Sequence, residues 1–214
     1  MERNLLINAP FFNNQIEIIR HIVKSLPPGY ALCVKENPSQ STREWRKISE
    51  YKEILDIPNI KLLHPEFPKE ELLSKCSLVV TITGTSGLEG TSYGKPSIVF
   101  ADVGYSILSS VFRCREPEKL SELIRKALVT HVTPIELDKF LQIYEKYCFD
   151  FDWFAFSTKY LDHFYYGGGT VDREISSSQM ESFLVQNKEE LMVLTNAHIK
   201  KISELKNRYS NIQT

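Results

Sequence analysis

Residues 81–90, TITGTSGLEG, constrain the fold of this chain more than any other stretch. The apolar residues 78–80 lead into this stretch, and Gly94-Lys95-Pro96 and a second apolar run at 97–100 follow it. This order predicts a strand, a tight turn, the start of a short helix and another strand. Exposed N–H groups at the start of a helix attract phosphate or carboxylate, and small residues allow such a group to approach the backbone. The stretch therefore predicts a nucleotide or nucleotide-sugar site on a parallel sheet.

Composition and charge narrow the classes of protein that fit. The chain has 214 residues, of which 42% are hydrophobic, enough for one large domain or one domain with an extension. Its formal net charge of −1 provides no broad basic field for nucleic acid or an anionic membrane. No apolar run approaches the ~20 residues of a membrane span, and the N-terminus lacks the apolar core of a signal peptide. Cys33, Cys76, Cys114 and Cys148 show no CxxC spacing, which favours free thiols in a reducing cytoplasm over disulfides or zinc.

Apolar runs alternate with helical patterns over the first 130 residues. We expect strands at residues 5–7, 30–35, 60–63, 78–82, 97–100 and 111–114. We expect helices after Asn13 or Asn14, within 39–55, from Pro68, after Gly84 and over 117–128. This alternation indicates βαβ units with right-handed crossovers. The sequence thus predicts an α/β fold with a Rossmann-like parallel sheet flanked by helices. Residues 1–130 are expected to form this domain and to bind a nucleotide sugar.

The character of the chain changes after this region. Residues 135–166 are rich in aromatic side chains at helical spacing, and residues 179–209 predict one or two helices rich in Lys and Glu. Between them, Gly167-Gly168-Gly169-Thr170 predicts a flexible break. Residues 131–214 are therefore expected to form a helical extension with a Gly-rich break near 167–170.

Polar loops follow four of the expected strands, at residues 35–38, 64–66, 83–89 and 101–105. Because ligands of parallel sheets bind beyond the carboxyl ends of the strands, we expect these loops to converge on one rim. The residues expected to bind a nucleotide sugar there are Lys35, Asn37, Pro38, His64, Pro65, Thr83, Gly84, Thr85, Ser86, Gly87 and Glu89.

Individual side chains at this rim have two interpretations each. Thr83, Thr85 and Ser86 can donate hydrogen bonds to phosphate oxygens, although hydroxyl groups at such positions also cap helices. Glu89 lies one turn into the helix, where it either interacts with the helix dipole or accepts hydrogen bonds from ribose hydroxyls. His64 either contacts a base or phosphate or simply ends a strand. The sequence assigns no catalytic residue.

Several well-known motifs are absent from the sequence. Residues 90–96 lack the GxxxxGK[ST] spacing of a phosphate-binding P-loop, and Pro96 stands where the hydroxyl residue is required. Residues 84–87 have neither the GxGxxG spacing of nicotinamide and flavin dehydrogenases nor the GxSxG spacing of a nucleophile elbow. Asp150-Phe151-Asp152 matches the DxD pattern by which one glycosyltransferase class holds a metal. Its aromatic neighbours favour surface acids beside a packing face, so we expect no metal.

A series of segments in the first 105 residues is similar to a known family. The segments are 10–15, 25–30, 34–38, 58–63, 81–89 and 94–96, together with Phe100 and Tyr105. They resemble capsule polysaccharide biosynthesis proteins, which are related to the bacterial transferases of Kdo, an acidic sugar carried on CMP. The resemblance covers residues 10–128, over half of the chain.

The resemblance implies the C-terminal, donor-binding half of a GT-B glycosyltransferase, in which two Rossmann-like domains face each other across a cleft. It implies that residues 83–86 hold the donor phosphate, that Glu89 contacts the sugar of the nucleotide, and that residues 35–38 face the nucleotide. The implied function is donor binding in capsular or cell-surface polysaccharide biosynthesis. No cofactor is expected, because the nucleotide sugar, CMP-linked in the related transferases, is a co-substrate.

Two departures from the family leave the activity open. Asn37 stands where the family usually has His, and Asn can supply neither a proton nor a cationic imidazole. The sequence also begins where a donor-binding half begins, so we expect a fragment, one part of a split enzyme, or a lone remnant. Besides a transferase, a non-catalytic nucleotide-sugar-binding or scaffold module and a nucleotide-sugar epimerase remain alternatives.

The expected partners follow from the same resemblance. They are a nucleotide-sugar donor, a glycan or glycolipid acceptor, and a chain that supplies an N-terminal acceptor domain. Neither nucleic acid nor a transmembrane segment is expected. The expected location is the cytoplasm, at the periphery of the inner membrane through partners.

Overall fold

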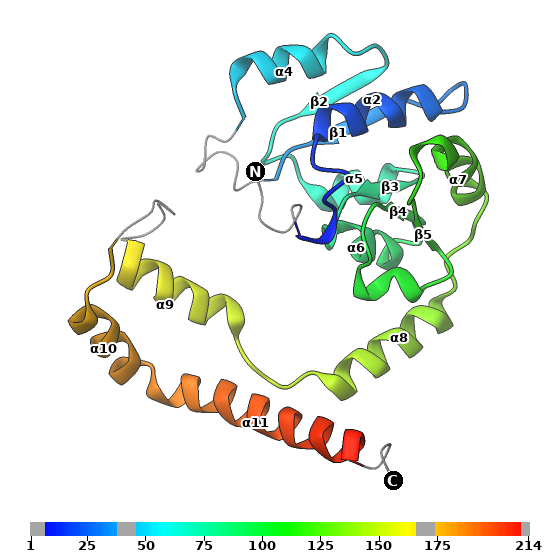
Figure 1. Ribbon diagram of the computed structural model, residues 1–214. Helices are drawn as coiled ribbons and strands as arrows, with labels where there is room; N and C mark the ends of the chain where they lie inside the picture. Colours follow the sequence, from blue (N-terminus) through cyan, green and yellow to red (C-terminus); the bar gives the residue numbers. More distant parts are fainter. Residues whose placement is uncertain (1–6, 38–45, 166–173, 211–214) are drawn as a thin grey trace. The chain divides into compact units, whose positions relative to one another are not determined.

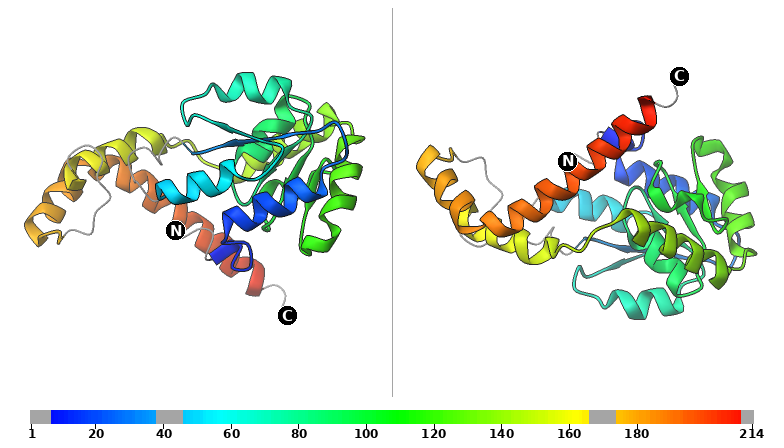
Figure 2. Two further views of the ribbon diagram at one scale, coloured as in Figure 1. Left: turned by 90° about the horizontal axis from the view of Figure 1, so that it is seen from above. Right: turned by 90° about the horizontal axis from the view of Figure 1, so that it is seen from below.

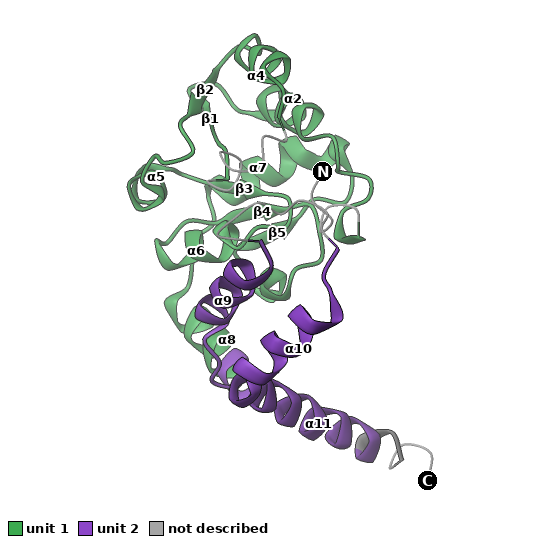
Figure 3. Ribbon diagram, turned by 90° about the vertical axis from the view of Figure 1, so that its left-hand side faces the viewer, with its two compact units in different colours: residues 1–143 green, residues 144–214 purple. Residues whose placement is uncertain are grey.

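The computed structural model describes residues 7–37, 46–165 and 174–210 (Figure 1). The chain divides into two compact units, residues 1–143 and residues 144–214 (Figure 3). All the described strands belong to the first unit, and the described part of the second unit is helical. The expected division into domains after residue 130 stays a prediction.

The strands of the first unit pair in parallel. β1 (Leu32–Lys35) pairs with β2 (Ile60–Leu63), with Leu32 opposite Ile60. β3 (Val79–Thr81), β4 (Ser97–Val99) and β5 (Val111–Arg113) form a three-stranded sheet in the order β3-β4-β5. The expected α/β fold is thereby confirmed, and five of the expected strands are present within a residue or two of their expected bounds.

In the described chain, the strands form two small sheets instead of the predicted single sheet. β1 pairs only with β2 and β3 pairs only with β4, so no hydrogen-bonded pairing joins β1 to β3. The first expected strand, at residues 5–7, lies outside the described residues except for Ile7, which is helical. Apolar side chains from β1 and β3 therefore face a pocket, described below, where a continuous sheet would have placed a paired neighbour.

The helices of the first unit occur in the expected order along the chain. The side chain of Asn14 accepts a hydrogen bond from the backbone N–H of Glu17, at 3.2 Å, so Asn14 rather than Asn13 caps the first of them. The described helices of this region are α2 (Gln15–Ser25), α4 (Ile48–Leu55), α5 (Lys69–Lys75), α6 (Ser86–Ser92) and α7 (Leu120–Leu128), with the 3-10 turns η1 (Gly104–Ile107) and η2 (Pro117–Lys119).

α2 and α7 lie side by side and pack on the three-stranded sheet (Figure 2). Ile18 and Ile22 are four residues apart on one face of α2, and Leu120 and Ile124 have the same spacing on α7. All four are buried against Ile98 of β4, which is fully inaccessible to solvent. Burial of each such side chain stabilises the fold by about 1.5–3 kcal/mol. This layer fixes the position of β3 and of the loop that follows it.

A second apolar cluster supports β4 and β5 around Tyr105. Val99, Tyr105, Leu108 and Val111 pack with Phe140, which comes from α8 (Pro134–Tyr147). The backbone N–H and hydroxyl of Ser109 both donate to the carboxylate of Glu136, in the first turn of α8, and fix the start of this helix. α8 is thus held on the first unit at residues 136 and 140.

The second unit is built on an aromatic core. It contains α9 (Trp153–Tyr165), α10 (Ser177–Gln186) and α11 (Lys188–Ser210). Phe156, Tyr160 and Phe164 recur every four residues on α9, and their rings lie 5.9, 6.0 and 4.9 Å from the ring of Phe183 on α10. The predicted Gly-rich break at 167–170 lies outside the described residues. No helix in the described ranges is long and apolar enough to cross a membrane.

Candidate functional site

The loop between β3 and α6 is held by side chains on both sides. The backbone N–H of Gly84 donates to Oγ1 of Thr81, at 3.1 Å, and the hydroxyl of Tyr105 donates to the carbonyl oxygen of Gly84. A Cβ atom at position 84 would lie 2.7 Å from Oγ1 of Thr81, closer than real Cβ contacts allow. A larger residue here would displace the Thr81 side chain, and the two hydrogen bonds to Gly84 hold the turn in this conformation.

Tyr105 also sets the position of α6. A Cβ atom at Gly87 would lie 2.7 Å from the hydroxyl oxygen of Tyr105 and 3.0 Å from its ring. Tyr105 is buried, and burial together with the charge of Glu89 raises the pKa of its phenol to about 12. The phenol consequently remains a protonated hydrogen-bond donor at neutral pH.

A charged pair joins α5 to α6 beside this loop. Nζ of Lys69 lies 2.9 Å from Oε2 of Glu89, and the hydroxyl of Thr85 donates to Oε1 of the same carboxylate at 3.1 Å. The hydrogen bond to Glu89 and its charge raise the pKa of Lys69. Glu89 is thus positioned by a cation and a hydroxyl, both from residues that line the same pocket.

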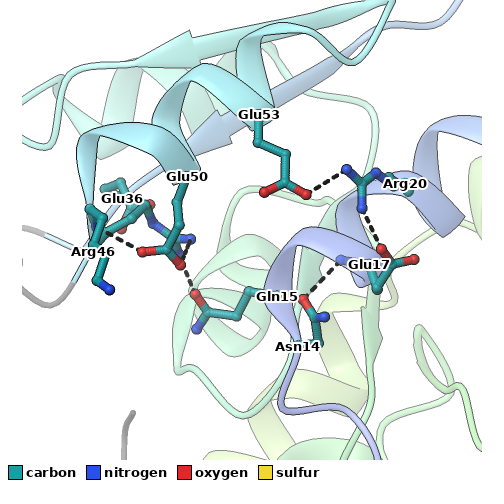
Figure 4. Close-up of polar contacts among 9 residues, drawn as sticks. Asn14, Gln15, Glu17, Arg20, Glu36, Arg46, Glu50 and Glu53 are labelled. Atoms are coloured by element: carbon teal, nitrogen blue, oxygen red, sulfur yellow. Dashed lines mark hydrogen bonds and ion pairs between the residues drawn. The ribbon is translucent and has the colours of Figure 1, made fainter.

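A buried charged pair holds the end of β1 (Figure 4). Nε of Arg46 donates to Oε1 of Glu36 at 2.6 Å, and both side chains are 8% exposed. The same guanidinium also donates to the side-chain oxygen of Gln15, in the first turn of α2. Nζ of Lys35 donates to the carbonyl oxygen of Pro65 at 2.7 Å, which ties the end of β1 to the end of β2. The carboxyl ends of β1 and β2 are therefore linked through polar contacts.

These parts surround one pocket of about 620 Å³ within the first unit. Such a volume is typical of small-molecule sites. The polar part of its wall includes Lys35, Glu36, Asn37, Arg46, Lys69, Thr83, Gly84, Thr85, Ser86 and Glu89. Its apolar part comes from β1, β3 and α2 and includes Leu32, Val80 and Ile18. The pocket thus combines an apolar wall with convergent polar groups at the carboxyl ends of parallel strands.

Seven of the eleven predicted binding residues line this pocket: Lys35, Asn37, Thr83, Gly84, Thr85, Ser86 and Glu89. Gly87 is instead buried against Tyr105, and Pro65 contributes its carbonyl oxygen to Lys35. The His64 side chain is 74% exposed outside the pocket wall, and its Nδ1 accepts a hydrogen bond from the backbone N–H of Glu66. Pro38 lies outside the described residues. The roles of these residues in binding stay predictions.

Arg46 and Lys69 line the pocket although sequence reasoning did not select them. Lys69 follows Pro68 at the start of an expected helix, and this position gives no sign of its contact with Glu89, twenty residues later. Arg46 lies in a polar stretch with no distinctive spacing. Only the tertiary structure brings these two cations to the pocket.

The described residues contain no group of three or more His, Cys, Asp or Glu side chains that could hold a metal ion. Within the Asp150-Phe151-Asp152 pattern, Oδ1 of Asp152 accepts a hydrogen bond from the backbone N–H of Ala155 at 2.9 Å. This contact lies at the start of α9, where such acceptors satisfy free N–H groups. The four cysteines are free thiols.

Comparison with known families identifies the segment that carries the pocket. Residues 9–109 match the family model described as capsule polysaccharide biosynthesis protein. This segment belongs to the capsule polysaccharide biosynthesis protein family. It contains β1 to β4 and the seven predicted residues of the pocket wall. The match therefore supports a role of this segment in capsule synthesis. Neither the comparison with curated proteins nor that with solved structures gave a match.

Proposed function

We propose that the first unit binds a nucleotide sugar in the pocket between the ends of β1 and β3, as the donor-binding domain of a glycosyltransferase in capsular or cell-surface polysaccharide synthesis. One observation carries this proposal. Asn37 and residues 83–86, from two distant strand ends, line the same pocket within a segment of the capsule polysaccharide biosynthesis family.

The composition of the pocket wall suits an anionic ligand with a flat ring. The wall has more positive than negative side chains. It contains three cations (Lys35, Arg46 and Lys69) and two carboxylates (Glu36 and Glu89). The hydroxyls of the 83–86 loop add donors for phosphate oxygens, and the apolar wall between the strands is suited to a base or sugar ring. A CMP-linked acidic sugar offers a phosphate, a carboxylate and a ring, so we propose this class of donor.

The proposed reaction is the transfer of the sugar to an acceptor hydroxyl. The acceptor oxygen forms a bond to the anomeric carbon, and the bond from that carbon to the phosphate oxygen breaks. The nucleotide leaves with the electron pair of the broken bond, and the donors of the pocket stabilise its charge. The hydroxyl proton passes to a base on the acceptor side, which we assign to an N-terminal GT-B domain supplied by a partner or by a longer chain.

Calorimetric titration of the full chain with CMP, UDP and GDP tests donor binding. We expect binding below the millimolar range, with CMP preferred. Thr85→Ala should weaken it several-fold, because the change removes the hydroxyl that holds Glu89 in the pocket wall. Thr130→Ala is the matched control, since the hydroxyl of Thr130 donates to the backbone of α7 away from the pocket. Absence of binding by all three nucleotides would refute the proposal.

Asn37 favours a second candidate function, nucleotide-sugar binding without catalysis. It lines the pocket where the family usually has His, and an amide cannot transfer a proton. Co-expression with a protein that supplies the N-terminal half, followed by a transfer assay, separates the two candidates. Activity that Glu89→Ala abolishes would support the transferase. Nucleotide binding without activity, with activity gained in Asn37→His, would support the non-catalytic module.

A further inference from the structure

The three cations of the pocket differ in what holds them. Lys35 donates to the carbonyl oxygen of Pro65 at 2.7 Å, and Arg46 forms the buried pair with Glu36. Breaking the Arg46 pair would leave a buried carboxylate uncompensated. Both cations are therefore parts of the folded framework.

Lys69 is held differently. Its side chain is 57% exposed, and its ion-pair partner Glu89, 33% exposed, lies on the same pocket wall. Exposed ion pairs of this kind contribute little net stability, because water solvates both groups well. Thr85 also donates to Glu89 at 3.1 Å, so the carboxylate keeps a hydrogen bond when the ammonium moves away. Lys69 can thus exchange its partner at low cost.

We propose that Lys69 is an anion-binding residue of the pocket. Its ammonium moves away from Glu89 and binds the phosphate of the nucleotide-sugar donor. This inference rests on the proposed donor-binding function. In the structure, Glu89 is the counter-ion of Lys69. On binding, the phosphate replaces the carboxylate as the partner of the ammonium, and Glu89 becomes available to the hydroxyls of the ribose. Phosphate competes well for a lysine because it presents several charged oxygens.

Two further observations support this exchange. Lys69 begins α5, and Ser86 of α6 and the preceding loop of residues 83–85 line the same pocket, so the ammonium shares this wall with donors that can contact an anion. The proximity of Glu89 also raises the pKa of Lys69, which keeps the ammonium charged throughout the neutral range.

Titration of the full chain with CMP and with cytidine tests the role of Lys69. Lys69→Gln should weaken CMP binding about tenfold, the usual effect of losing one hydrogen bond to a charged group, and should not weaken the binding of cytidine, which has no phosphate. Lys75→Gln is the matched control. Lys75 lies on the same helix and pairs with Glu71 at 2.6 Å, but it does not line the pocket. The Lys75→Gln variant should bind CMP as the unaltered chain does.

Inorganic phosphate separates direct binding from simple charge repulsion, because Lys69→Gln also leaves Glu89 without its cation. Glu89→Gln alone should strengthen phosphate binding several-fold, since it frees the ammonium. The double variant Lys69→Gln/Glu89→Gln should bind phosphate weakly. Restoration of phosphate binding in the double variant to the level of the unaltered chain would show repulsion alone and overturn the inference.

The outcomes also separate this inference from the proposed function. CMP binding that persists unchanged in Lys69→Gln would overturn the role of Lys69 and leave donor binding intact. A failure of the unaltered chain to bind any of the three nucleotides would refute both. Circular dichroism spectra of each variant confirm that the fold is retained, which is expected because Lys69 and Glu89 form a partly exposed pair.

Discussion

The hydroxyl of Tyr105 donates a hydrogen bond to the carbonyl oxygen of Gly84, across twenty-one residues of sequence. Because Tyr105 packs in the apolar cluster with residues of β4 and β5, this bond links the loop of residues 83–86 to the core. We therefore assign Tyr105 a positioning role for the proposed donor site.

Replacement of Tyr105 by Phe tests this role. Tyr105→Phe keeps the ring but leaves the Gly84 carbonyl without this donor, which we expect to lower the free energy of unfolding by about 1–2 kcal/mol. Nucleotide affinity should fall several-fold, because the loop loses its support. Urea denaturation and calorimetry measure the two effects. Tyr147→Phe, at an exposed tyrosine of the second unit, should change neither, and equal effects of the two variants would contradict the assignment.

The close contact of Gly87 with Tyr105 leads to a second prediction. In Gly87→Ala the new methyl group would lie 2.7 Å from the hydroxyl oxygen of Tyr105, so α6 or the tyrosine must shift. We expect a loss of about 1–3 kcal/mol in the free energy of unfolding, the usual cost of overpacking. Gly104→Ala provides the control, because a Cβ atom there meets nothing within 4 Å. Additivity of Gly87→Ala and Tyr105→Phe in the double variant would argue against the contact.

The buried pair of Glu36 and Arg46 predicts a larger effect. Arg46→Met leaves the Glu36 carboxylate buried without its cation, and we expect a cost of about 3–5 kcal/mol in urea denaturation. Addition of Glu36→Met should recover part of this loss, since no buried charge then remains. Arg20, which pairs with Glu17 and Glu53 on the surface, provides the comparison, and Arg20→Met should have a much smaller effect (Figure 4). Equal losses at the two arginines would contradict this prediction.

The contact between Ser109 and Glu136 predicts a pH-dependent contribution to stability. The hydroxyl and the backbone N–H of Ser109 donate to the Glu136 carboxylate and lower its pKa below the usual 4.5. Because the folded state has the lower pKa, the contribution is complete above about pH 4.5 and is lost as the pH falls through the lowered value. Glu136→Gln should thus lower the urea midpoint at pH 7 and have little effect near pH 3. Since Glu136 is only partly buried and water screens its charge, the difference should be below about 1 kcal/mol.

Glu122→Gln, at an exposed carboxylate of α7, provides the control for this pH series and should show no such trend. A midpoint difference for Glu136→Gln that stays constant from pH 7 to pH 3 would show that the carboxylate charge is not responsible.

Much of the site could be predicted from the sequence, because each of its loops follows a recognisable strand. The runs ending at Lys35 and Thr81 were predictable from apolar side chains, and the small residues that follow Thr81 indicated a tight turn. Seven pocket residues were selected in this way. His64 was selected by the same rule, but β2 is the partner of β1 on the side away from β3, and its end does not reach the pocket wall.

The sequence by itself determined which segments are strands and helices, since apolar periodicity, caps and turn residues act within a few positions of one another. The capping contact from Asn14 to Glu17 is such a local interaction. The tertiary structure alone decided that β1 and β3 face a pocket, that Arg46 is buried with Glu36, and that Lys69 meets Glu89. These contacts join residues ten to several tens of positions apart, so they depend on the packing of the apolar faces of α2 and α7 against the strands.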